Sequence, residues 1–327
     1  MMSEVVQLPL RERLACDGEA PRASVPAEVW AQLERIGVPL SAGDDPVRVS
    51  RSDLDWLRAE PLERALRDDG PLPVRDVHLA FCVDSTNTRA LAAPIPEPGW
   101  CDVWIADHQT AGRGRRDARW QSPFASGLCM TLATSLPLRE DFAALPLVLG
   151  LAARRALAPF GLDDLAVKWP NDLLIGARKL GGILVESRHM AGQDPVFAMG
   201  LGLNVHAVPD RVSEDALAPV SLRDVLADGT PTRHAVVVAV LRHWRAAIHT
   251  FCVEGFGAFA KEWTRADCLY GRRIDVGDDV VLSGIARGVD ATGQLRLVTE
   301  SGEQVVPCGA IRIRPADTTG REVGQHG

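Results

Sequence analysis

Three polar side chains of different chemistry gather within five residues, in the segment Lys168-Trp169-Pro170-Asn171-Asp172. Pro170 cannot donate to a strand ladder, so this segment is expected to be a turn at the end of a strand. An amine, an amide and a carboxylate at such a turn can contact an anion, a polar ring and a metal ion, respectively. A solvated turn is the usual explanation of a lone lysine or aspartate, so the chemical interpretation depends on the rest of the chain.

A second candidate is the loop over residues 112–120, which reads Gly-Arg-Gly-Arg-Arg-Asp-Ala-Arg-Trp. Glycines let backbone amides approach a ligand closely, and the interleaved arginines offer forked donors suited to phosphate or carboxylate. Trp120 could stack on a purine. The loop is neither a Walker A loop nor a dinucleotide-binding G-x-G-x-x-G motif that opens a helix. By itself it fits a flexible surface or RNA-contacting segment as well as a nucleotide clamp.

The elements that must position these segments are α+β in character. Apolar runs at 173–175 and 180–185 flank the turn-prone residues 176–178, and this pattern predicts a β-hairpin. Further strands are expected at 78–83, 103–107, 127–134, 165–168 and 197–205, and helices at 86–93, 142–158 and 234–263. Strands joined by short turns imply a central mixed or mainly antiparallel sheet, with helices on one face.

The chain divides into four expected parts. Residues 1–77 form a small unit, with helical spacing at 8–16, 27–36 and 53–67, a hairpin at 38–49 and a turn-rich linker at 68–73. Residues 78–266 form the central domain. Residues 267–315 carry short runs at 273–276, 280–285, 288–290, 295–299 and 304–308, which predict a barrel of about five strands. Residues 316–327 are a polar tail.

Composition excludes several classes of protein. At 327 residues the chain needs two or three domains, and its net charge of −7 gives no general nucleic-acid or membrane footprint. The seven cysteines are scattered without metal-binding spacing, which favours reduced thiols and no structural zinc. The N-terminus lacks a signal peptide, and the longest apolar runs, at 145–153 and 235–241, are too short to span a bilayer. We expect a soluble, cytoplasmic protein.

Taken together, these segments resemble the biotin protein ligases, also called biotin–acetyl-CoA-carboxylase ligases. The matching pieces follow the family's order: residues 84–87 (Asp-Ser-Thr-Asn), 109–115 (Gln-Thr-Ala-Gly-Arg-Gly-Arg), Trp120, 168–172, 179–186 and 200–205 (Gly-Leu-Gly-Leu-Asn-Val). The resemblance covers about residues 78–315. It implies a class II synthetase-like catalytic domain, an SH3-like C-terminal barrel and a winged-helix-like N-terminal unit.

The resemblance also implies a two-step acyl transfer. Biotin and ATP, with Mg²⁺, give biotinyl-5′-AMP, and a lysine of the biotin carboxyl carrier domain of acetyl-CoA carboxylase then takes the biotinyl group. The first step brings a carboxylate and a phosphate together, so positive groups must offset their repulsion. One alternative function is that of a lipoate–protein ligase, which has related chemistry but another substrate. The other is that of a DNA-binding regulator that ligates biotin and also represses transcription. No membrane partner is expected, and a homodimer is one arrangement that the family allows.

Site residues are carried over by their place in these motifs. The catalytic set is Lys168, Arg113 and Arg115. The biotin-binding set is Ser85, Thr86, Gln109, Gly112, Arg113, Lys168, Gly181 and Gly182. The adenylate-binding set is Arg115, Arg116, Trp120, Asn171 and Asn204, and Asp172 is the expected metal ligand.

Six further residues lie in or near these motifs. Asn87 is expected to be a structural cap and Glu186 a structural residue, whereas Lys179 is as compatible with a surface position as with a ligand role. Asp117 and Ala118 stand where the family usually has a second Gly-Arg pair, and Arg119 lies one place later.

In some members of the family that this chain resembles, a DNA-binding winged helix precedes the catalytic domain. Residues 1–78 occupy the same place but lack the positive charge that DNA binding needs. They contain ten arginines, no lysine and fifteen acidic residues, so their net charge is −5. The helix expected at 27–36 carries two acids and one base, whereas a DNA-reading helix needs the reverse. Residues 17–26 leave no room for a middle helix. The sequence therefore predicts a degenerate winged-helix-like unit that does not bind DNA.

Overall fold

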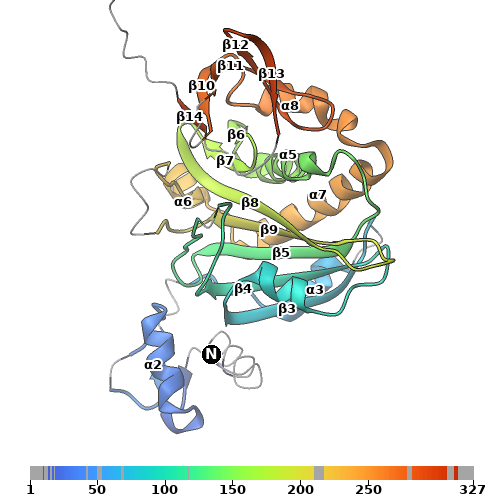
Figure 1. The fold of residues 1–327 in the computed structure, drawn as a ribbon. Coiled ribbons are helices and arrows are strands. Elements are labelled where there is room, and N and C mark those ends of the chain that lie inside the picture. Colours follow the sequence, from blue (N-terminus) through green and yellow to red (C-terminus); the bar gives the residue numbers. More distant parts are fainter. Residues whose placement is uncertain are drawn as a thin grey trace, which may run out of the picture.

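The computed structural model describes Leu10, Leu14, Asp17 and residues 19–41, 43–49, 54–67, 70–116, 118–209, 217–277, 282–307 and 313–315. A large central sheet carries the middle of the chain, with the N-terminal unit at one end and a small C-terminal sheet at the other (Figure 1). The polar tail at 316–327 and most of the helix expected at 8–16 lie outside the described residues.

The central sheet has seven strands in the order β3-β4-β5-β9-β8-β7-β6. Their bounds are β3 (Val74–Val83), β4 (Cys101–Gln109), β5 (Gly127–Ser135), β6 (Leu165–Lys168), β7 (Asp172–Ile175), β8 (Arg178–Arg188) and β9 (Val196–Asn204). The pair β3–β4 is parallel and every other neighbouring pair is antiparallel, which confirms the predicted mixed sheet. The hairpin predicted around residues 176–178 is β7–β8. Several boundaries differ from the prediction: β3 begins at Val74 rather than at residue 78, and both β4 and β8 extend beyond the predicted runs at 103–107 and 180–185.

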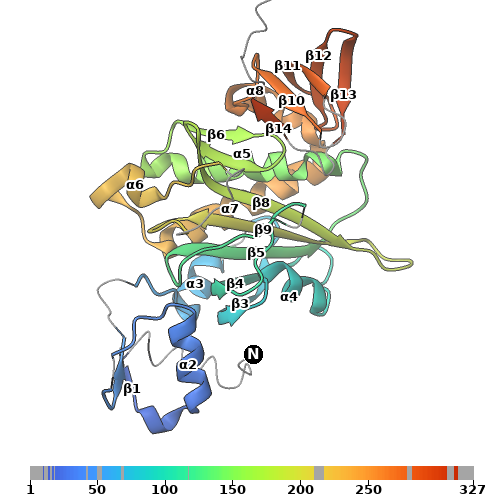
Figure 2. The ribbon, with the colours of Figure 1, turned by 60° about the vertical axis from the view of Figure 1, so that its left-hand side comes forward.

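Helices cover both faces of this sheet, and the expectation of a single covered face was wrong. Helices α5 (Leu145–Leu157) and α7 (Arg233–Glu254) pack together on one face, where they share a core with Leu132 and Met199. Helix α4 (Thr86–Ala92) lies against the other face, where Ala90 packs with Ala133 and Ala198. Because strand side chains alternate, Leu132 and its neighbour Ala133 belong to different faces. Figure 2 shows α4 beside β3 and β4.

The helix expected at 234–263 is interrupted. Helix α7 ends at Glu254 because Gly255 takes the left-handed φ of 73°, and its N–H closes the helix on the Phe251 carbonyl. A 3-10 turn (Phe256–Phe259) and helix α8 (Ala260–Ala266) follow. The helix expected at 142–158 is α5, flanked by 3-10 turns at Phe142–Ala144 and Ala158–Phe160.

Two helical stretches, Phe142–Phe160 and Arg233–Glu254, are long and apolar enough to cross a membrane by length and composition alone. The apolar runs singled out in the sequence, 145–153 and 235–241, form only part of these two stretches. Both stretches contribute to the hydrophobic core of the central domain. Leu149, Leu151, Trp244 and Ile248 on these helices are almost completely buried. Core helices of this kind pass the same test, so the finding is weak evidence for a membrane.

The C-terminal sheet has five strands in the order β13-β12-β11-β10-β14. They are β10 (Arg273–Val276), β11 (Leu282–Val289), β12 (Leu295–Thr299), β13 (Gly302–Val306) and β14 (Ile313–Pro315). The runs predicted at 280–285 and 288–290 belong to one strand, β11, whose register with β12 shifts between Ala286 and Val289. The fifth strand is β14, which the sequence pattern did not predict; residues 278–281 and 308–312 lie outside the described part.

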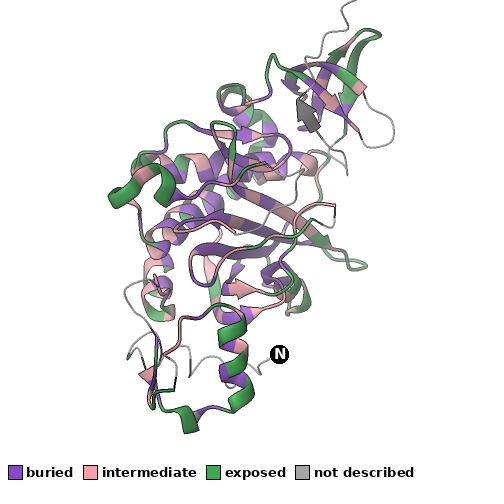
Figure 3. Cartoon of the chain, turned by 90° about the vertical axis from the view of Figure 1, so that its left-hand side faces the viewer, coloured by how far each residue is buried: buried purple, intermediate pink, exposed green. Residues whose placement is uncertain are grey.

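The N-terminal unit contains helix α2 (Ala27–Arg35) and a small antiparallel pair, β1 (Glu19–Ala20) with β2 (Val47–Arg48). A bridge between Leu40 and Val49 supports the hairpin predicted at 38–49. A 3-10 turn, Arg22–Ser24, stands where a middle helix would be needed. Figure 3 shows that much of α2 is exposed, whereas the strands of the central sheet are mostly buried.

The helix expected at 53–67 is shorter than predicted, because α3 spans only Ala59–Leu66. Its Leu62 and Leu66 belong to the core of the central domain, not to that of the N-terminal unit. The core of the N-terminal unit continues instead through Trp56, whose ring makes edge contacts with Phe81 and Phe124. Residues 54–67 therefore tie the N-terminal unit to the central sheet.

Candidate functional site

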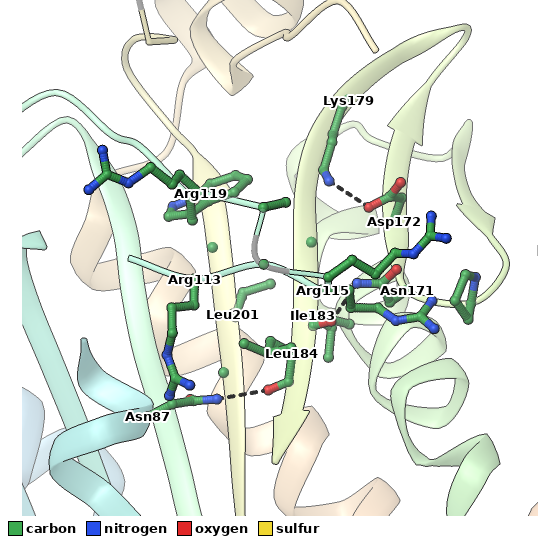
Figure 4. Close-up of a pocket in the computed structure, with 18 of the residues that line it drawn as sticks. Asn87, Arg113, Arg115, Arg119, Asn171, Asp172, Lys179, Ile183, Leu184 and Leu201 are labelled. Carbon is green, nitrogen blue, oxygen red and sulfur yellow. Dashed lines mark hydrogen bonds and ion pairs between the residues drawn. The ribbon is translucent and has the colours of Figure 1, made fainter. Parts of the chain in front are cut away.

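A cavity of about 350 Å³ lies over β8 and β9, between the glycine–arginine loop and the β6–β7 turn (Figure 4). Both segments singled out by the sequence line it, although about fifty residues separate them in the chain. The predicted residues on its wall are Ser85, Thr86, Gln109, Arg113, Arg115, Arg116, Trp120, Lys168, Asn171, Asp172 and Gly182. The fold thus brings most of the predicted site together.

Two glycines of β9 make room for the cavity floor. A Cβ atom added to Gly202 would collide with the indole ring of Trp120, and one added to Gly200 would lie 2.5 Å from Asn87 Oδ1. The two residues are two positions apart on a strand, so both face the same side of the sheet. The Gly-Leu-Gly motif therefore allows Trp120 and helix α4 to lie directly on β9.

The β6–β7 turn presents Lys168 and Asn171 to the cavity. Lys168 ends β6, and its carbonyl accepts a hydrogen bond of 3.0 Å from the Asn171 N–H, which confirms the predicted turn. The Asn171 Nδ2 donates to the carbonyl of Ile183 (2.8 Å), and the Ile183 N–H donates back to the Asn171 carbonyl (2.9 Å). These contacts fix the turn that follows Lys168 against β8.

Asp172 and Lys179 form an ion pair of 2.6 Å across the β7–β8 hairpin, and both line the cavity. Lys179 is thus a residue of the cavity wall and not a purely exposed surface lysine. Asp172 is the only carboxylate on the described part of the wall. Among the described residues, three potential metal ligands gather only at Asp76, His78 and Asp102, which do not line this cavity.

A set of neutral hydrogen-bonding groups forms the end of the cavity near α4. The Thr86 N–H and hydroxyl donate to Gln109 Oε1 at 2.7 and 3.1 Å. Thr131 Oγ1 lies 2.8 Å from the Thr86 hydroxyl and 2.6 Å from Asn87 Oδ1. Thr86, Asn87 and Thr131 are buried and Gln109 is half-buried, and these groups orient one another. Those of them that line the cavity carry both donors and acceptors.

Asn87 is not the helix cap that the sequence suggested. Helix α4 starts at Thr86 with Ser85 in the cap position, and Asn87 lies inside the first turn. Its side chain instead reaches β8, where Nδ2 donates to the Leu184 carbonyl (3.1 Å) and to Glu186 Oε2 (2.9 Å). Asn87 therefore joins α4 to β8 at the edge of the cavity.

The glycine–arginine loop is itself a narrow hairpin. Arg113 and Arg119 form a bridge, the Gly114 N–H donates to the Ala118 carbonyl (2.6 Å), and the Trp120 N–H donates to the Gly112 carbonyl (3.0 Å). Arg119, for which the sequence predicted no definite role, lines the cavity. Asp117 lies outside the described residues.

Three predicted residues do not reach the described cavity wall: Gly112, Gly181 and Asn204. A Cβ atom on Gly181 would lie 2.6 Å from the Gly202 carbonyl, so this glycine serves the close approach of β8 and β9. The Asn204 side chain is buried, and its Nδ2 donates to the carbonyls of Val220 (3.1 Å) and of the wall residue Lys179 (3.5 Å).

Sequence reasoning also missed part of the wall. The residues concerned are Asn87, Gly114, Ala118, Met130, Trp169, Pro170, Ile183, Leu184, Gly200, Leu201, Gly202 and Leu217. The period-two pattern could have assigned Gly200 and Gly202 to one face of their strand, but Leu201 between them also lines the wall. Nothing in that pattern says which face carries the cavity.

The charge of the wall differs from that of the whole chain. Six basic side chains line its described part, namely Arg113, Arg115, Arg116, Arg119, Lys168 and Lys179, against the single described carboxylate, that of Asp172. The chain as a whole has a net charge of −7. Such a concentration of positive groups in a concave site attracts anions and stabilises developing negative charge.

Comparisons with known proteins show what the chain is similar to. The model of the "Biotin/lipoate A/B protein ligase family" matches residues 79–204. The bifunctional ligase/repressor BirA of Escherichia coli is 33% identical over 251 residues, covering 76% of this chain and 77% of that protein. The biotin–[acetyl-CoA-carboxylase] ligase of Mycobacterium tuberculosis is 31% identical over 274 residues, covering 80% and 98%.

Among solved structures, the biotin protein ligase from Aquifex aeolicus in complex with biotin and ATP has the same fold. The TM-score is 0.63 at 24% identity, and the match covers 74% of this chain and all of that one. With the motifs assembled on one cavity and relatives of this similarity over most of their length, the chain belongs to the biotin protein ligase family and is an ATP-dependent ligase.

Proposed function

We propose that this protein activates biotin with ATP to form biotinyl-5′-AMP and then transfers the biotinyl group to a lysine of a carrier protein. The observation that carries the proposal is the assembly of the 168–172 turn and the glycine–arginine loop on one strongly basic cavity. Relatives named as biotin ligases support the substrate, as do solved relatives whose titles name biotin and ATP.

The first step joins a carboxylate to an α-phosphate, two anions that repel each other. Lys168 lies at the end of β6 on the cavity wall, where its ammonium can contact both groups. Arg115 and Arg116 come from the loop, and their guanidinium groups suit the phosphate and carboxylate of the intermediate. Preorganised positive groups of this kind lower the barrier because they need no reorientation as charge develops.

The neutral end of the cavity suits biotin. A ureido group needs both donors and acceptors, and the Ser85–Thr86 segment with Gln109 and Asn87 offers both. The apolar side chains of Met130, Leu184 and Leu201 can cover the rest of the ring system and its aliphatic chain. Trp120, lying on Gly202, offers a flat surface to the adenine.

The described residues of this site fit Mg²⁺ only as an ion that is bound jointly by the protein and the nucleotide. Asp172 is a single carboxylate already paired with Lys179, so it cannot hold a cation alone. Mg²⁺ commonly binds through one or two carboxylates together with nucleotide phosphates. We therefore infer that the metal enters with ATP, that Asp172 is its protein ligand and that Lys179 releases Asp172 when it binds.

The acceptor is proposed to be the biotin carboxyl carrier domain of acetyl-CoA carboxylase, because the relatives from Mycobacterium tuberculosis and Paracoccus denitrificans carry that enzyme in their names. We place the reaction in the cytoplasm. The five described cysteines are free thiols, as in a reducing compartment, and burial raises the pKa of Cys101 and of Cys129 to about 12. Sedimentation of the purified chain will test whether it forms the homodimer that the family allows.

The domain roles are proposed in the same terms. Residues 78–266 are the catalytic domain, residues 267–315 an SH3-like barrel, and residues 1–77 a degenerate winged-helix-like unit without DNA-binding activity. Relatives named ligase/repressor make DNA binding a real alternative for this unit. Glu28 and Glu34 on α2, beside a single basic residue, Arg35, argue against it.

Incubation of the purified protein with ATP, biotin and a carrier domain, followed by a streptavidin blot, tests the proposal. Biotinylation that requires ATP and the carrier lysine is the expected result. Because the matching family model also covers lipoate ligases, a parallel reaction with lipoate is needed. Transfer of lipoate without transfer of biotin would replace the proposed substrate.

A further inference from the structure

Glu186 touches the glycine–arginine loop although it is not part of the described cavity wall. Its two carboxylate oxygens each lie 2.8 Å from a terminal nitrogen of Arg113, Oε1 from Nη1 and Oε2 from Nη2. The same Oε2 accepts from Asn87 Nδ2 (2.9 Å). Glu186 on β8 therefore holds the loop and helix α4 at one point.

The pairing is bidentate, so it fixes the orientation of Arg113 as well as its position. The Arg113 Nη2 also donates to the hydroxyl of Thr88 on α4 (3.1 Å), which leaves both terminal nitrogens engaged with the protein. Figure 4 shows Arg113 directed toward Asn87, whereas Arg115 is directed toward Asn171. In this arrangement Arg113 braces the loop, while Arg115 extends across the cavity.

Arg113 is also the residue from which the loop hairpin starts. It bridges Arg119, and the turn between them contains Gly114, whose backbone has few steric restraints. A fixed Arg113 therefore sets the direction of the whole hairpin and the place of Arg115 over the cavity.

We propose that Glu186 is a positioning residue, which holds the loop over the cavity through Arg113 and thereby slows release of the adenylate. The proposal rests on the function proposed above and assigns Arg113 to bracing of the loop instead of direct contact with biotin. Two other roles are distinguishable by experiment: Arg113 could bind the ligand itself, or Glu186 could serve only the stability of the sheet.

A double-mutant cycle separates these roles. Glu186→Gln keeps the shape of the side chain and an acceptor for Asn87 but removes the charge, and Arg113→Gln removes the other partner. The measurements are release of biotinyl-AMP from the preloaded enzyme, the KM for biotin, kcat of adenylation and the unfolding midpoint. Each single variant should release the adenylate about three- to tenfold faster, since the pair is charged and bidentate but partly exposed.

The double variant decides the mechanism. If Arg113 acts through Glu186, the double variant releases the adenylate no faster than either single variant. If the two effects multiply, Arg113 contacts the ligand itself and the proposal is wrong. An unchanged release rate in Glu186→Gln, or a loss confined to the unfolding midpoint, overturns it as well.

Limited trypsin digestion of the ligand-free protein gives a second measurement that needs no enzymatic activity. The loop contains several arginines, so loosening it should speed cleavage within residues 113–119 in Glu186→Gln, about threefold or more. Glu186→Asp, which keeps the charge but is too short for both contacts, should fall between the parent and Glu186→Gln. Equal cleavage of the parent, Glu186→Gln and Glu186→Asp would contradict the proposed role of Glu186. This outcome does not depend on which substrate the protein uses.

The matched control is Glu303→Gln, which removes another exposed ion pair, that of Glu303 with Arg296 on the C-terminal sheet. It should change neither adenylate release nor loop cleavage. Failure of the parent enzyme to form any biotinyl-AMP would count against the proposed function, whereas normal activity with multiplicative effects would count only against the role of Glu186.

Discussion

The indole N–H of Trp169 donates a hydrogen bond of 3.0 Å to the carbonyl of Gly293, and this contact joins the turn that follows Lys168 to the β11–β12 turn of the C-terminal sheet. The Trp169 side chain is almost completely buried. Gly293 has a φ of 81° and packs so closely on Ala144 that a Cβ atom would lie 2.5 Å from the Ala144 Cβ. The C-terminal sheet therefore supports the turn that carries Lys168.

Trp169→Phe should lower both stability and activity. The phenyl ring keeps most of the packing but leaves the buried Gly293 carbonyl without its donor, which costs about 1–3 kcal/mol of the free energy of unfolding. A looser turn should also slow adenylation by about three- to tenfold, because misplacement of a catalytic group is costly. Urea unfolding and pyrophosphate exchange measure the two effects. Trp244→Phe is the control: it removes a similar bond, to the Leu149 carbonyl, and should lower stability without slowing the folded enzyme.

Lys168→Ala should slow adenylation by about a hundredfold or more while the protein stays folded, since a preorganised charge is lost from the transition state. Pyrophosphate exchange with biotin and ATP measures the rate. Lys261→Ala, on exposed α8, is the control and should behave like the parent. Near-normal exchange in Lys168→Ala would show that another group screens the two anions.

Arg115→Gly should form adenylate but release it, so that lysines of bystander proteins become biotinylated. The guanidinium group is expected to hold the carboxylate and phosphate of the intermediate, and each such contact is worth about 1.5–3 kcal/mol. Its loss should speed release by roughly ten- to a hundredfold. A streptavidin blot of an added bystander protein reads the outcome. Labelling confined to the carrier domain, as fast as in the parent, would mean that Arg115 does not retain the intermediate.

In the same experiment, labelling of bystander proteins by the parent enzyme tests whether its own loop retains the adenylate. Asp117 stands where the family usually has glycine, and a carboxylate there could pair with a loop arginine. If the parent itself labels bystanders, the substitution at position 117 has weakened the loop.

Asp267 makes stability depend on pH. Burial raises the pKa of its carboxyl group from 3.8 to about 6, although the Leu269 N–H donates to Oδ1, and Oδ2 has no hydrogen-bond partner among the described residues. The folded state binds this proton more tightly than the unfolded chain does. The resulting stability is complete below about pH 4 and is lost as the pH rises through about 6.

Asp267→Asn should therefore raise the free energy of unfolding at pH 8 by about 1–3 kcal/mol and flatten its decrease between pH 4 and 6. Urea titrations at pH 5 and 8 measure this. Asp141→Asn is the opposite case, because burial raises the pKa of Asp141 but hydrogen bonds from Arg139 and the Phe256 N–H outweigh it and lower that pKa. Its removal should destabilise the protein at neutral pH. A steeper pH dependence in Asp267→Asn would refute the assignment.

The N-terminal unit should not bind duplex DNA specifically. Its net charge of −5 over residues 1–78 repels phosphate, and α2 carries more acidic than basic side chains. A gel-shift assay with the promoter of a biotin-synthesis gene, with and without biotin and ATP, tests this. Sequence-selective binding below about 1 μM at physiological salt would show that the unit is a DNA reader after all.

The sequence by itself determined the local elements and the chemistry that they carry. Pro170 ends β6 at Lys168, as predicted, because proline cannot continue a ladder. Apolar runs around a glycine-containing turn predicted the β7–β8 hairpin for reasons of period and turn geometry. The segments 112–120 and 168–172 were recognisable because their charged and polar residues stand at an unusual spacing. Turn, hairpin and spacing depend only on residues that are neighbours in the chain.

Tertiary structure decided which of those residues meet. Glu186 pairs with Arg113 across seventy-three positions of sequence, and Trp169 with Gly293 across more than a hundred. Asn204, which belongs to a motif that predicted a nucleotide contact, is buried and donates to the carbonyls of Val220 and Lys179, and it does not line the described cavity wall. Local pattern cannot encode these outcomes, because the face that a strand presents to a helix or a loop depends on how distant segments pack against it.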